Sequence, residues 1–525
     1  MYTHTSAHRL IGLLLAAIIT MAGCSFGQKS PDNTQITPTP QKVNEGGTLI
    51  IARMSDAANL DPHFILTINE ASVVQGKVYE GLVKRDMNMD IQPQLATSWE
   101  QIDDLTWEFT LRKGVVFHDG TRFDAQAVKR TFDRVLDPKV ASPRAAMFEK
   151  VKLVKVIDPY RVQIILHKPF APLLSILASH EGSIISPTAI DKYGRELSHH
   201  PVGTGPYQFQ SWEPGSQITL SKNQSYWGDA GTLDQVVFKV VPDDEARIAM
   251  VENGEVHVAE SIPVMELDRI QASSQMRVYR SDALGTEFVG FNVARPPLND
   301  IRVRKAISMA IETGAIIKGV YNNVGTMANS PMGPHVFGYS PTVKSYPYDI
   351  NQARRLLAEA GYPDGFPIQM ITYNRQDRIL VAQVIRSQLK GIGIDAELQI
   401  VSYDEFVQTI EKNKDHEIFV SGWANATGDA DYNQYNLFHT SGGGAGNSFQ
   451  YSNPELDRLI EAGRVETDPA KRLAIYAKAQ ELELQDALVV PIRNLENLAV
   501  ISNKIQGFSI SPAGYVNIDQ VVISQ

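Results

Sequence analysis

Strand-like and helix-like patterns alternate along the chain from Gly46 to the C-terminus, without a linker rich in proline, glycine or serine between them. Residues 106–112 alternate large apolar and polar side chains, which is typical of a half-buried strand, and residues 161–166 repeat the alternation. Helix patterns lie between such strands. The sequence therefore predicts a mixed α/β fold whose domains share several chain crossings or pack tightly together.

Local signals predict where several elements begin and end. Asp349 is suited to cap a helix that stops at Gly361. Two further helices are expected to start at Asn453-Pro454 and Asp468-Pro469, because proline is favoured at the first helical position. The other expected elements are a strand over 48–52, a helix over 69–83 that ends near Gly81, a strand over 368–372 and a helix over 379–390.

The composition excludes several classes of protein. The chain has 525 residues, of which 43 % are hydrophobic and 21 % charged, and this indicates globular domains. A nucleic-acid-binding protein of this size would normally be basic, whereas the formal net charge is −10. Cys24 is the only cysteine, which excludes a disulfide framework and a thiolate metal cluster.

The first 24 residues have the features of an export signal. Residues 10–22 form an apolar stretch that follows Arg9 and is too short to span a bilayer. Met21-Ala-Gly-Cys24 resembles a lipobox, so we expect a signal peptide over 1–23 and a lipidated Cys24. An ordinary signal peptide with a chance cysteine is the alternative. Residues 24–44 are polar and contain three prolines, which predicts a flexible tether to an extracytoplasmic body anchored to the membrane.

Motifs of catalysis and of nucleotide or metal binding are missing from the sequence. Gly442–Gly446 lacks the Gly-Lys-Ser/Thr of a phosphate-binding loop, and Gly203-Thr-Gly205 lacks the third glycine of a dinucleotide fingerprint. The His-Glu pairs at 180–181 and 416–417 have no second histidine at zinc-ligand spacing. We therefore expect that the protein is not an enzyme and has no cofactor and no metal site.

A series of sequence blocks follows in order after Gly46. They are Leu60-Asp-Pro-His63, Tyr79-Glu-Gly-Leu-Val83, Pro93–Glu100, Thr106–Thr121, Pro201–Tyr207, Asn223–Trp227, Asn299–Ala306 and Leu356–Gly365. Together these blocks resemble the family 5 extracellular solute-binding proteins of ABC importers, which include peptide and nickel binders.

Within that family, the run Gly-Trp-Ala-Asn-Ala-Thr-Gly-Asp-Ala-Asp at Gly422–Asp431 is most similar to the glutathione-binding branch. Peptide binders usually place an aspartate where this chain has Ala426. This departure argues against plain di- or oligopeptide binding, unless Asp429 or Asp431 approaches the peptide amine from farther along the segment.

The resemblance also implies an architecture. It is a two-lobed clamp of the periplasmic-binding-protein kind (type II) with mixed sheets, and the ligand lies between lobes that close by a hinge. Lobe I is expected to combine residues 45–85, 202–288 and 498–525, with residues 86–201 inserted as domain II. Residues 289–497 are expected to form lobe III.

Arg378 is the first candidate for ligand binding. The run Tyr373-Asn-Arg-Gln-Asp-Arg378 matches the pattern from which dipeptide binders of this family present an arginine to the ligand carboxylate. Such a pair is directional and charge-assisted. Arg375 is the fallback, and a solvated residue in the first helical turn is the alternative interpretation of Arg378.

The segment Trp423–Ser448 is the second candidate, because so long a loop, rich in glycine, asparagine and aspartate, is usually functional. An ordinary surface loop is the alternative. Its rings could stack on a ligand, and either of two aspartates could pair with a ligand ammonium. The candidate contacts are Trp423, Asn425, Asp429, Asp431 and Tyr432.

Three polar residues elsewhere complete the set of candidates. Thr67 and Asn69 lie in a segment that faces the cleft in the family, although either would also serve as an ordinary helix cap. Asn292 lies next to the expected crossing between the lobes, where a structural hydrogen bond is the alternative to a ligand contact.

The resemblance and the missing motifs lead to one functional expectation. A lipid-anchored, monomeric receptor would capture glutathione or a related short peptide and deliver it to an ABC permease. Alternatives within the family are a di- or oligopeptide binder and a receptor for nickel, another metal chelate or haem. An extracytoplasmic hydrolase or peptide chaperone is a different class, and the nucleophile–base constellation that a hydrolase needs is missing.

Overall fold

The computed structural model describes residues 46–442 and 447–524. The predicted signal peptide, the predicted lipidation site Cys24 and the tether up to residue 44 lie outside the described residues. Within the described ranges, no helix combines the length and the apolar character that crossing a membrane requires.

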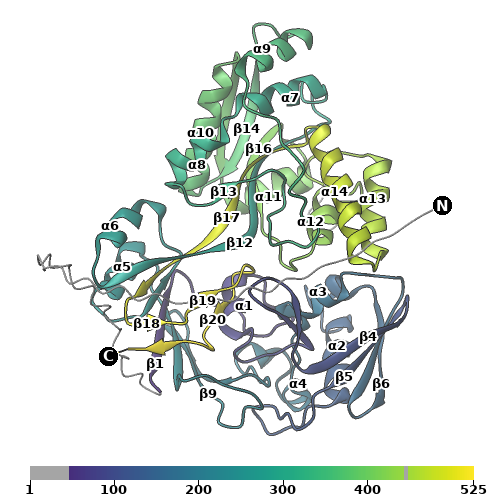
Figure 1. The fold of residues 1–525 in the computed structure, drawn as a ribbon, viewed down its shortest axis with the longest axis vertical. Helices are drawn as coiled ribbons and strands as arrows, with labels where there is room; N and C mark the ends of the chain where they lie inside the picture. Colours follow the sequence, from purple (N-terminus) through teal and green to yellow (C-terminus); the bar gives the residue numbers. More distant parts are fainter. Residues whose placement is uncertain (1–45, 443–446, 525) are drawn as a thin grey trace, which may run out of the picture. The chain divides into compact units, whose positions relative to one another are not determined.

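One mixed sheet of 11 strands contains the strand order β15-β14-β16-β12-β17-β11-β1-β10-β9-β8, and β13 pairs with β17 off this path. Its two longest strands, β12 (Met276–Phe291) and β17 (Val489–Ser502), are antiparallel neighbours in the middle. β1 pairs in parallel with β10 on one side, and β14 pairs in parallel with β15 on the other. Figure 1 shows β12 and β17 passing between the lower and the upper part. The predicted mixed α/β fold is confirmed.

The β1 lobe is the part of this sheet beyond β17 together with the helices beside it, in the lower half of Figure 1. Its core contains alternate residues of β1 and β10, such as Leu49, Ile51, Val236 and Phe238, all fully buried. Its elements are β1 (Thr48–Arg53), β8 (Tyr207–Glu213), β9 (Gln217–Lys222), β10 (Gln235–Val240), β11 (Val258–Glu260), α1 (Ile68–Val74), α5 (Asp244–Glu252) and α6 (Leu267–Ala272).

The β14 lobe lies beyond β12, with helices packed on β14 and its neighbours. Val381, Ile385 and Leu389 of α10 are fully buried against this sheet. Its elements are β13 (Thr326–Met327), β14 (Phe366–Tyr373), β15 (Ile394–Val401), β16 (Ile418–Trp423), α7 (Ile301–Ala310), α8 (Thr313–Tyr321), α9 (Ile350–Glu359), α10 (Gln376–Lys390), α11 (Tyr403–Val407), α12 (Ala430–Leu437), α13 (Pro454–Val465) and α14 (Pro469–Gln485).

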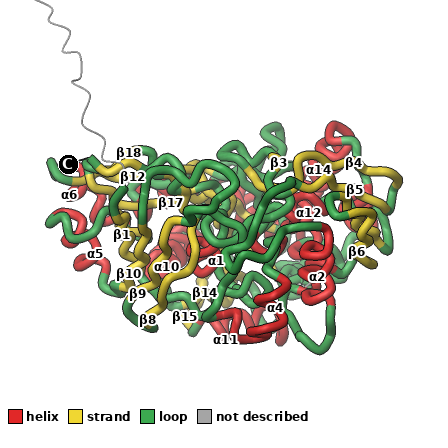
Figure 2. The backbone as a smooth tube through the Cα atoms, turned by 90° about the horizontal axis from the view of Figure 1, so that it is seen from below, coloured by secondary structure: helices red, strands yellow, loops and turns green. Residues whose placement is uncertain are grey.

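A separate antiparallel sheet, the β4 sheet, has the order β4-β5-β7-β6. Figure 2 shows it at the opposite end from β1, β9 and β10. Val128 and Phe132 of α2 are buried against its inner face. Its elements are β4 (Ala96–Asp103), β5 (Thr106–Leu111), β6 (Val151–Asp158), β7 (Arg161–Leu166), α2 (Ala125–Leu136), α3 (Leu173–Leu177) and α4 (Pro187–Tyr193).

Short strand pairs complete the described chain. They are β2 (Val83–Arg85) with β3 (Ile91–Pro93), β18 (Ile505–Gln506) with β21 (Val522–Ile523), and β19 (Ser509–Ile510) with β20 (Val516–Asn517).

The helix starts that depend on capping are confirmed. The Asp349 carboxylate accepts a hydrogen bond from the Gln352 N–H at 2.9 Å and begins α9. Asn453 and Asp468 cap α13 and α14 in the same way, each with proline at the first helical position. A capping side chain and the N–H that it accepts from are at most three residues apart, so the sequence alone is enough to predict these helix starts.

The helix expected over 69–83 is wrong beyond Val74. The chain turns at Gly76, whose φ of +69° favours glycine, and the carbonyl of Lys77 then accepts a hydrogen bond from the Tyr207 N–H at 2.9 Å. A partner far along the chain therefore overrides the local helical pattern. The division into lobe I, domain II and lobe III stays a prediction.

Candidate ligand-binding site

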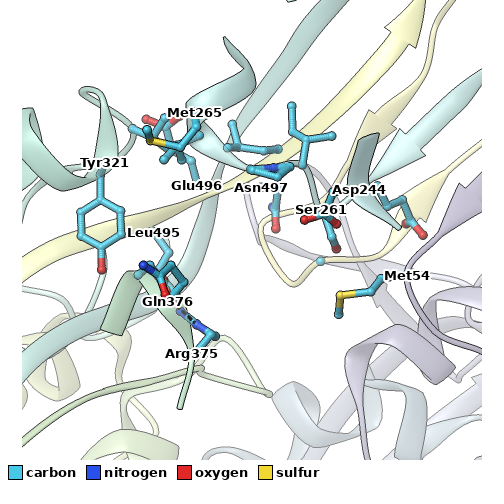
Figure 3. A pocket seen from close by; sticks show the side chains of 18 of the residues that line it. Met54, Asp244, Ser261, Met265, Tyr321, Arg375, Gln376, Leu495, Glu496 and Asn497 are labelled. Carbon is cyan, nitrogen blue, oxygen red and sulfur yellow. Dashed lines mark hydrogen bonds and ion pairs between the residues drawn. The ribbon is translucent and has the colours of Figure 1, made fainter. Parts of the chain in front are cut away.

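A cavity of about 630 Å³ lies along β17, between the β1 lobe and the β14 lobe. Met54 and Asn69 belong to the wall from the β1 lobe, and Arg375 and Gln376 at the start of α10 belong to the wall from the β14 lobe. Figure 3 shows Arg375 and Gln376 on one side of the open space and Met54 on the other. Small-molecule sites usually measure about 300–1,000 Å³, so a short peptide fits this volume.

Arg375 presents an exposed guanidinium to this cavity. Its side chain is 52 % exposed, and its Nε and Nη2 each donate to the Asp377 carboxylate at 2.6 Å. Burial alone would lower the pKa of Arg375, but the hydrogen-bonded Asp377 raises it, so the guanidinium stays charged. A ligand carboxylate that enters the cavity can reach this group.

Arg378 is buried beside the cavity and does not line it. Its side chain is 4 % exposed, and its Nη1 forms an ion pair with Glu287, which is fully buried in β12. Arg493, the cross-strand neighbour of Glu287 on β17, donates to the same carboxylate through Nε at 2.7 Å and Nη2 at 3.1 Å. Burial alone would raise the pKa of Glu287, but the charges of Arg378 and Arg493 hold it below the usual value.

Glu287 and Arg493 were missed at the level of sequence, although a signal for them exists. Each is the single charged residue of an apolar strand segment, at 284–291 and 487–495. Charged side chains are seldom fully buried unless they are paired. Two isolated charges of opposite sign in apolar strand segments are therefore expected to form an ion pair.

Trp423 and Tyr432 lie near Arg378. A Cβ on Gly422 would stand 3.3 Å from Arg378 Nη2, so the guanidinium packs on the backbone just before Trp423. The ring centroids of Trp423 and Tyr432 are 5.6 Å apart, and Trp423 Nε1 is buried without a hydrogen-bond partner in the described part of the chain. The structure thus brings three of the predicted site residues together.

The segment Trp423–Ser448 is not one continuous loop, because α12 interrupts it. Asp429 caps α12 by accepting a hydrogen bond from the Asp431 N–H at 2.9 Å, and both of its oxygens accept from Arg472 at 2.7 Å. Asn425 donates to the Asp429 carbonyl at 2.8 Å. Asp429 also accepts from Ser175 Oγ in α3 at 3.2 Å, so the polar atoms of Asn425 and Asp429 are occupied within the protein.

Asp431 has a different environment from Asp429. Its carboxylate is 11 % exposed and lies 2.8 Å from Arg464 Nε. Burial raises the pKa of Asp431 to about 6, because it outweighs the opposing charge of Arg464, and the charge of Asp429 adds to the rise. Near pH 6 this carboxyl group is therefore half protonated.

The three remaining candidates are spread over the fold. Thr67 caps α1, as expected of one of the two residues proposed for that role. Asn69 lines the cavity and donates to Ser55 Oγ at 3.0 Å. Asn292 follows the C-terminal end of β12 and donates to the carbonyl groups of His416 and Lys414 at 3.0 and 3.2 Å. Of these three, Asn69 is the one that faces the cavity.

The cavity walls combine apolar groups with charges that already have partners, an arrangement suited to holding a ligand.

Among residues 46–442 and 447–524, no group of three or more His, Cys, Asp or Glu side chains is placed to hold a metal ion.

Comparison with known proteins assigns the family. The family model described as "Bacterial extracellular solute-binding proteins, family 5 Middle" matches residues 90–445. The chain belongs to this family. As a member of family 5 it is a substrate-binding protein of an ABC importer. The glutathione-binding protein GsiB of Shigella dysenteriae serotype 1 (strain Sd197) is 30 % identical over 513 residues, which cover 95 % of this chain and 96 % of the relative.

Solved structures of family 5 proteins share the fold. HbpA2 from Haemophilus parasuis superposes with a TM-score of 0.83 at 26 % identity, covering 91 % of this chain and all of that one. DppA from Helicobacter pylori, in complex with the peptide STSA, superposes with a TM-score of 0.77 at 29 % identity and covers 91 % and 98 %. The expected two-lobed fold of a periplasmic binding protein is therefore confirmed.

Proposed function

We propose that this family 5 protein is a membrane-anchored lipoprotein that captures glutathione or a related short peptide and delivers it to its permease. The observation that carries the proposal is a cavity with one wall from each lobe and an exposed guanidinium on one of them. The similarity to a glutathione-binding protein along nearly the whole chain supports it. A ligand that touches both walls binds the closed state better, and this shifts the population toward closure.

Among the arginines near the cavity, Arg375 is best suited to a ligand carboxylate. A ligand that separates Arg375 from Asp377 breaks a partly exposed ion pair, which costs about 0–1 kcal/mol. A ligand that separated Arg378 from Glu287 would leave a fully buried carboxylate short of a partner, at a cost of about 3–5 kcal/mol. We therefore propose Arg375 ahead of Arg378, which stays the second candidate.

Two variants separate these arginines. Arg375→Ala should weaken the binding of glutathione by about 1.5–3 kcal/mol, the range for a hydrogen bond to a charged group, and should leave the melting temperature unchanged. Arg378→Ala should instead lower the melting temperature, because Glu287 loses a neighbouring cation. Isothermal titration and thermal unfolding measure both. Full affinity in Arg375→Ala, with lost affinity but an unchanged melting temperature in Arg378→Ala, would reverse the assignment.

A ligand panel tests the substrate class. Thermal shift and isothermal titration would compare reduced and oxidised glutathione, dipeptides, longer peptides and a nickel–histidine complex. We expect stabilisation by glutathione or a short peptide. Stabilisation by the nickel complex, with none by any peptide-like ligand, would refute the proposal and favour the metal-chelate alternative.

The lipid anchor is proposed from Cys24 and the residues before it. Cys24→Ala should abolish the incorporation of a labelled fatty acid and move the protein from the membrane fraction to the soluble one. Retained label in this variant would show that the fatty acid is attached to another residue.

We also propose that closure follows the predicted division into lobe I, domain II and lobe III. β12 and β17 are the long strands that connect the β1 lobe and the β14 lobe, so bending near their middle would move one wall of the cavity toward the other. Small-angle scattering should then give a smaller radius of gyration when a saturating ligand is bound. An unchanged radius would contradict hinge closure.

A further inference from the structure

Glu181 is a buried carboxylate without a hydrogen bond. It lies in the short turn His180–Gly182 after α3, and its side chain is 1 % exposed. Among the residues that the structure describes, neither of its carboxylate oxygens has a hydrogen-bond partner. Burying a charged group without such partners is costly. A group of this kind points to a donor that the described part of the protein does not supply.

Other buried carboxylates show how this fold usually compensates them. Glu80 accepts hydrogen bonds from three side chains at 2.8–2.9 Å. Glu287 has two guanidiniums beside it. The two carboxyl oxygens of Glu483 also have no hydrogen-bond partner among the described residues, but burial raises its pKa well above the usual value, so that side chain is held protonated. Glu181 has neither the donors of Glu80 nor the close guanidiniums of Glu287.

The nearest cation to Glu181 is Arg144, and part of its guanidinium forms no hydrogen bond within the described residues. Arg144 Nε lies 3.7 Å from Glu181 Oε1 and donates to the carbonyl of Ile65 at 2.7 Å. Within the described residues, no hydrogen bond is formed by the two Nη atoms of Arg144. His180 Nδ1 lies 3.3 Å from Glu181 Oε2, but burial lowers the pKa of this imidazole, so it is neutral at pH 7. An acceptor and a donor group thus stand side by side, each with unused hydrogen-bonding capacity.

Two tyrosines are within electrostatic reach of Glu181, and one of them contacts Trp423, a predicted site residue. Burial raises the pKa of Tyr432 and of Tyr515, and in both cases the negative charge of Glu181 adds to the rise, so Glu181 is within electrostatic reach of both rings. Tyr432 also contacts Trp423, whose Nε1 is buried without an acceptor. Tyr432 thus contacts a residue with an unused donor and is within electrostatic reach of an unused acceptor.

We propose that Glu181 and Arg144 bind the α-amino-carboxylate end of the ligand beside Tyr432. The Glu181 carboxylate accepts from the ligand ammonium, and the Arg144 Nη atoms donate to the adjacent carboxylate. Both contacts are charge-assisted, and the guanidinium can bind the carboxylate with two parallel hydrogen bonds. The inference rests on the proposed function, which it makes more specific.

This pair of contacts distinguishes two kinds of peptide. In glutathione the glutamate is linked through its side chain, so its α-ammonium and α-carboxylate stand on one carbon and are both free. An ordinary peptide has an ammonium at one end and a carboxylate at the other. The pair of Glu181 and Arg144 is therefore expected to favour γ-glutamyl peptides over their α-linked isomers.

Isothermal titration of the purified protein tests this with three probes: reduced glutathione, its α-linked isomer Glu-Cys-Gly and N-acetylglutathione. The wild type should bind glutathione at least about tenfold more tightly than either of the others, the effect of one lost hydrogen bond to a charged group. Glu181→Gln should lose about tenfold or more for glutathione and keep the wild-type affinity for N-acetylglutathione. Arg144→Gln should bind the two isomers equally.

Both controls are matched in the kind of substitution, and the glutamate control is also matched in burial. Glu483→Gln changes an equally buried glutamate whose side chain is already uncharged, and Arg130→Gln removes an exposed arginine paired with Asp191. Both should bind glutathione as the wild type does. Glu181→Gln should also keep or raise the melting temperature without ligand, because it removes a buried carboxylate that has no hydrogen bond within the described residues.

Two results would overturn the inference while the proposed function stands. One is glutathione binding by Glu181→Gln within about twofold of the wild type, and the other is equal wild-type binding of glutathione and N-acetylglutathione. The second result needs no variant, so it applies even if Glu181→Gln does not fold. If the wild type binds none of the three probes, the proposed function fails together with the inference.

Discussion

Asp429→Asn tests whether Asp429 is held inside the protein or is available to a ligand. In the wild type its two oxygens accept from Arg472 Nη2 and Nη1, both at 2.7 Å, and the two side chains are 2 % and 6 % exposed. Asparagine keeps one acceptor and turns an NH₂ group toward Arg472 in place of the other. Because a buried cation then loses its anion, we expect the free energy of unfolding to fall by about 3–5 kcal/mol.

Asp431→Asn is the matched control two residues away. Burial raises the pKa of Asp431 from 3.8 to about 6, so the folded protein keeps this proton over a pH range in which the unfolded chain has lost it. Stability therefore declines as the pH rises through this range, by about 2–3 kcal/mol in total, and the loss is complete at pH 7. Removing the charge offsets the lost ion pair with Arg464, so we expect a net change within about 1 kcal/mol.

Urea unfolding at pH 7, followed by tryptophan fluorescence, measures both variants, and glutathione titration follows on the folded proteins. With a slope of about 3 kcal/mol per molar urea, a loss of 3 kcal/mol moves the midpoint down by about 1 M for Asp429→Asn. The affinity of the folded variant for ligand should stay as in the wild type. An unchanged midpoint combined with a tenfold loss of affinity would refute the structural role and make Asp429 a ligand contact.

Two further variants test the fold itself. Burial lowers the pKa of His63 to about 3, so near pH 5 the unfolded chain binds a proton that the folded protein does not. The free energy of unfolding should therefore fall by about 2 kcal/mol from pH 6.5 to pH 5. His63→Asn keeps an acceptor for Arg134 and should remove this part of the pH dependence. Gly365→Ala places a Cβ 1.9 Å from the Gly393 carbonyl oxygen, whereas the Cβ of Gly361→Ala meets no atom within 4 Å. Both positions have positive φ, so both variants carry the same kind of backbone strain. Urea unfolding should therefore show that Gly365→Ala loses at least about 2 kcal/mol more free energy of unfolding than Gly361→Ala.

The elements that depend on short-range contacts could be predicted from the sequence. Asp349 caps α9 through an N–H three residues away, so the relevant partners stand together in any window of the chain. α1 is the counterexample, because the residues after Val74 have helical periodicity but their backbone pairs near Tyr207. The same limit applies to the segment after Trp423, where a composition rich in Asn, Asp and Gly hides the capped helix α12.

The binding residues are harder to predict, because whether a side chain can bind a ligand depends on the partners that distant parts of the chain supply. Arg375 and Arg378 carry the same group three positions apart. They differ because Arg378 is buried against Glu287 on a distant strand, whereas Arg375 is 52 % exposed and lies 3.9 Å from that carboxylate. Glu181 becomes a candidate only after the hydrogen-bond partners of the other buried carboxylates are known. A motif search favours Arg378 for the ligand carboxylate, whereas a search for uncompensated charges finds Glu181, which had no sequence signal. Glu181 is proposed for the ligand ammonium and Arg378 is the motif's candidate for a carboxylate, so the glutathione affinities of Glu181→Gln and Arg378→Ala test the two criteria separately.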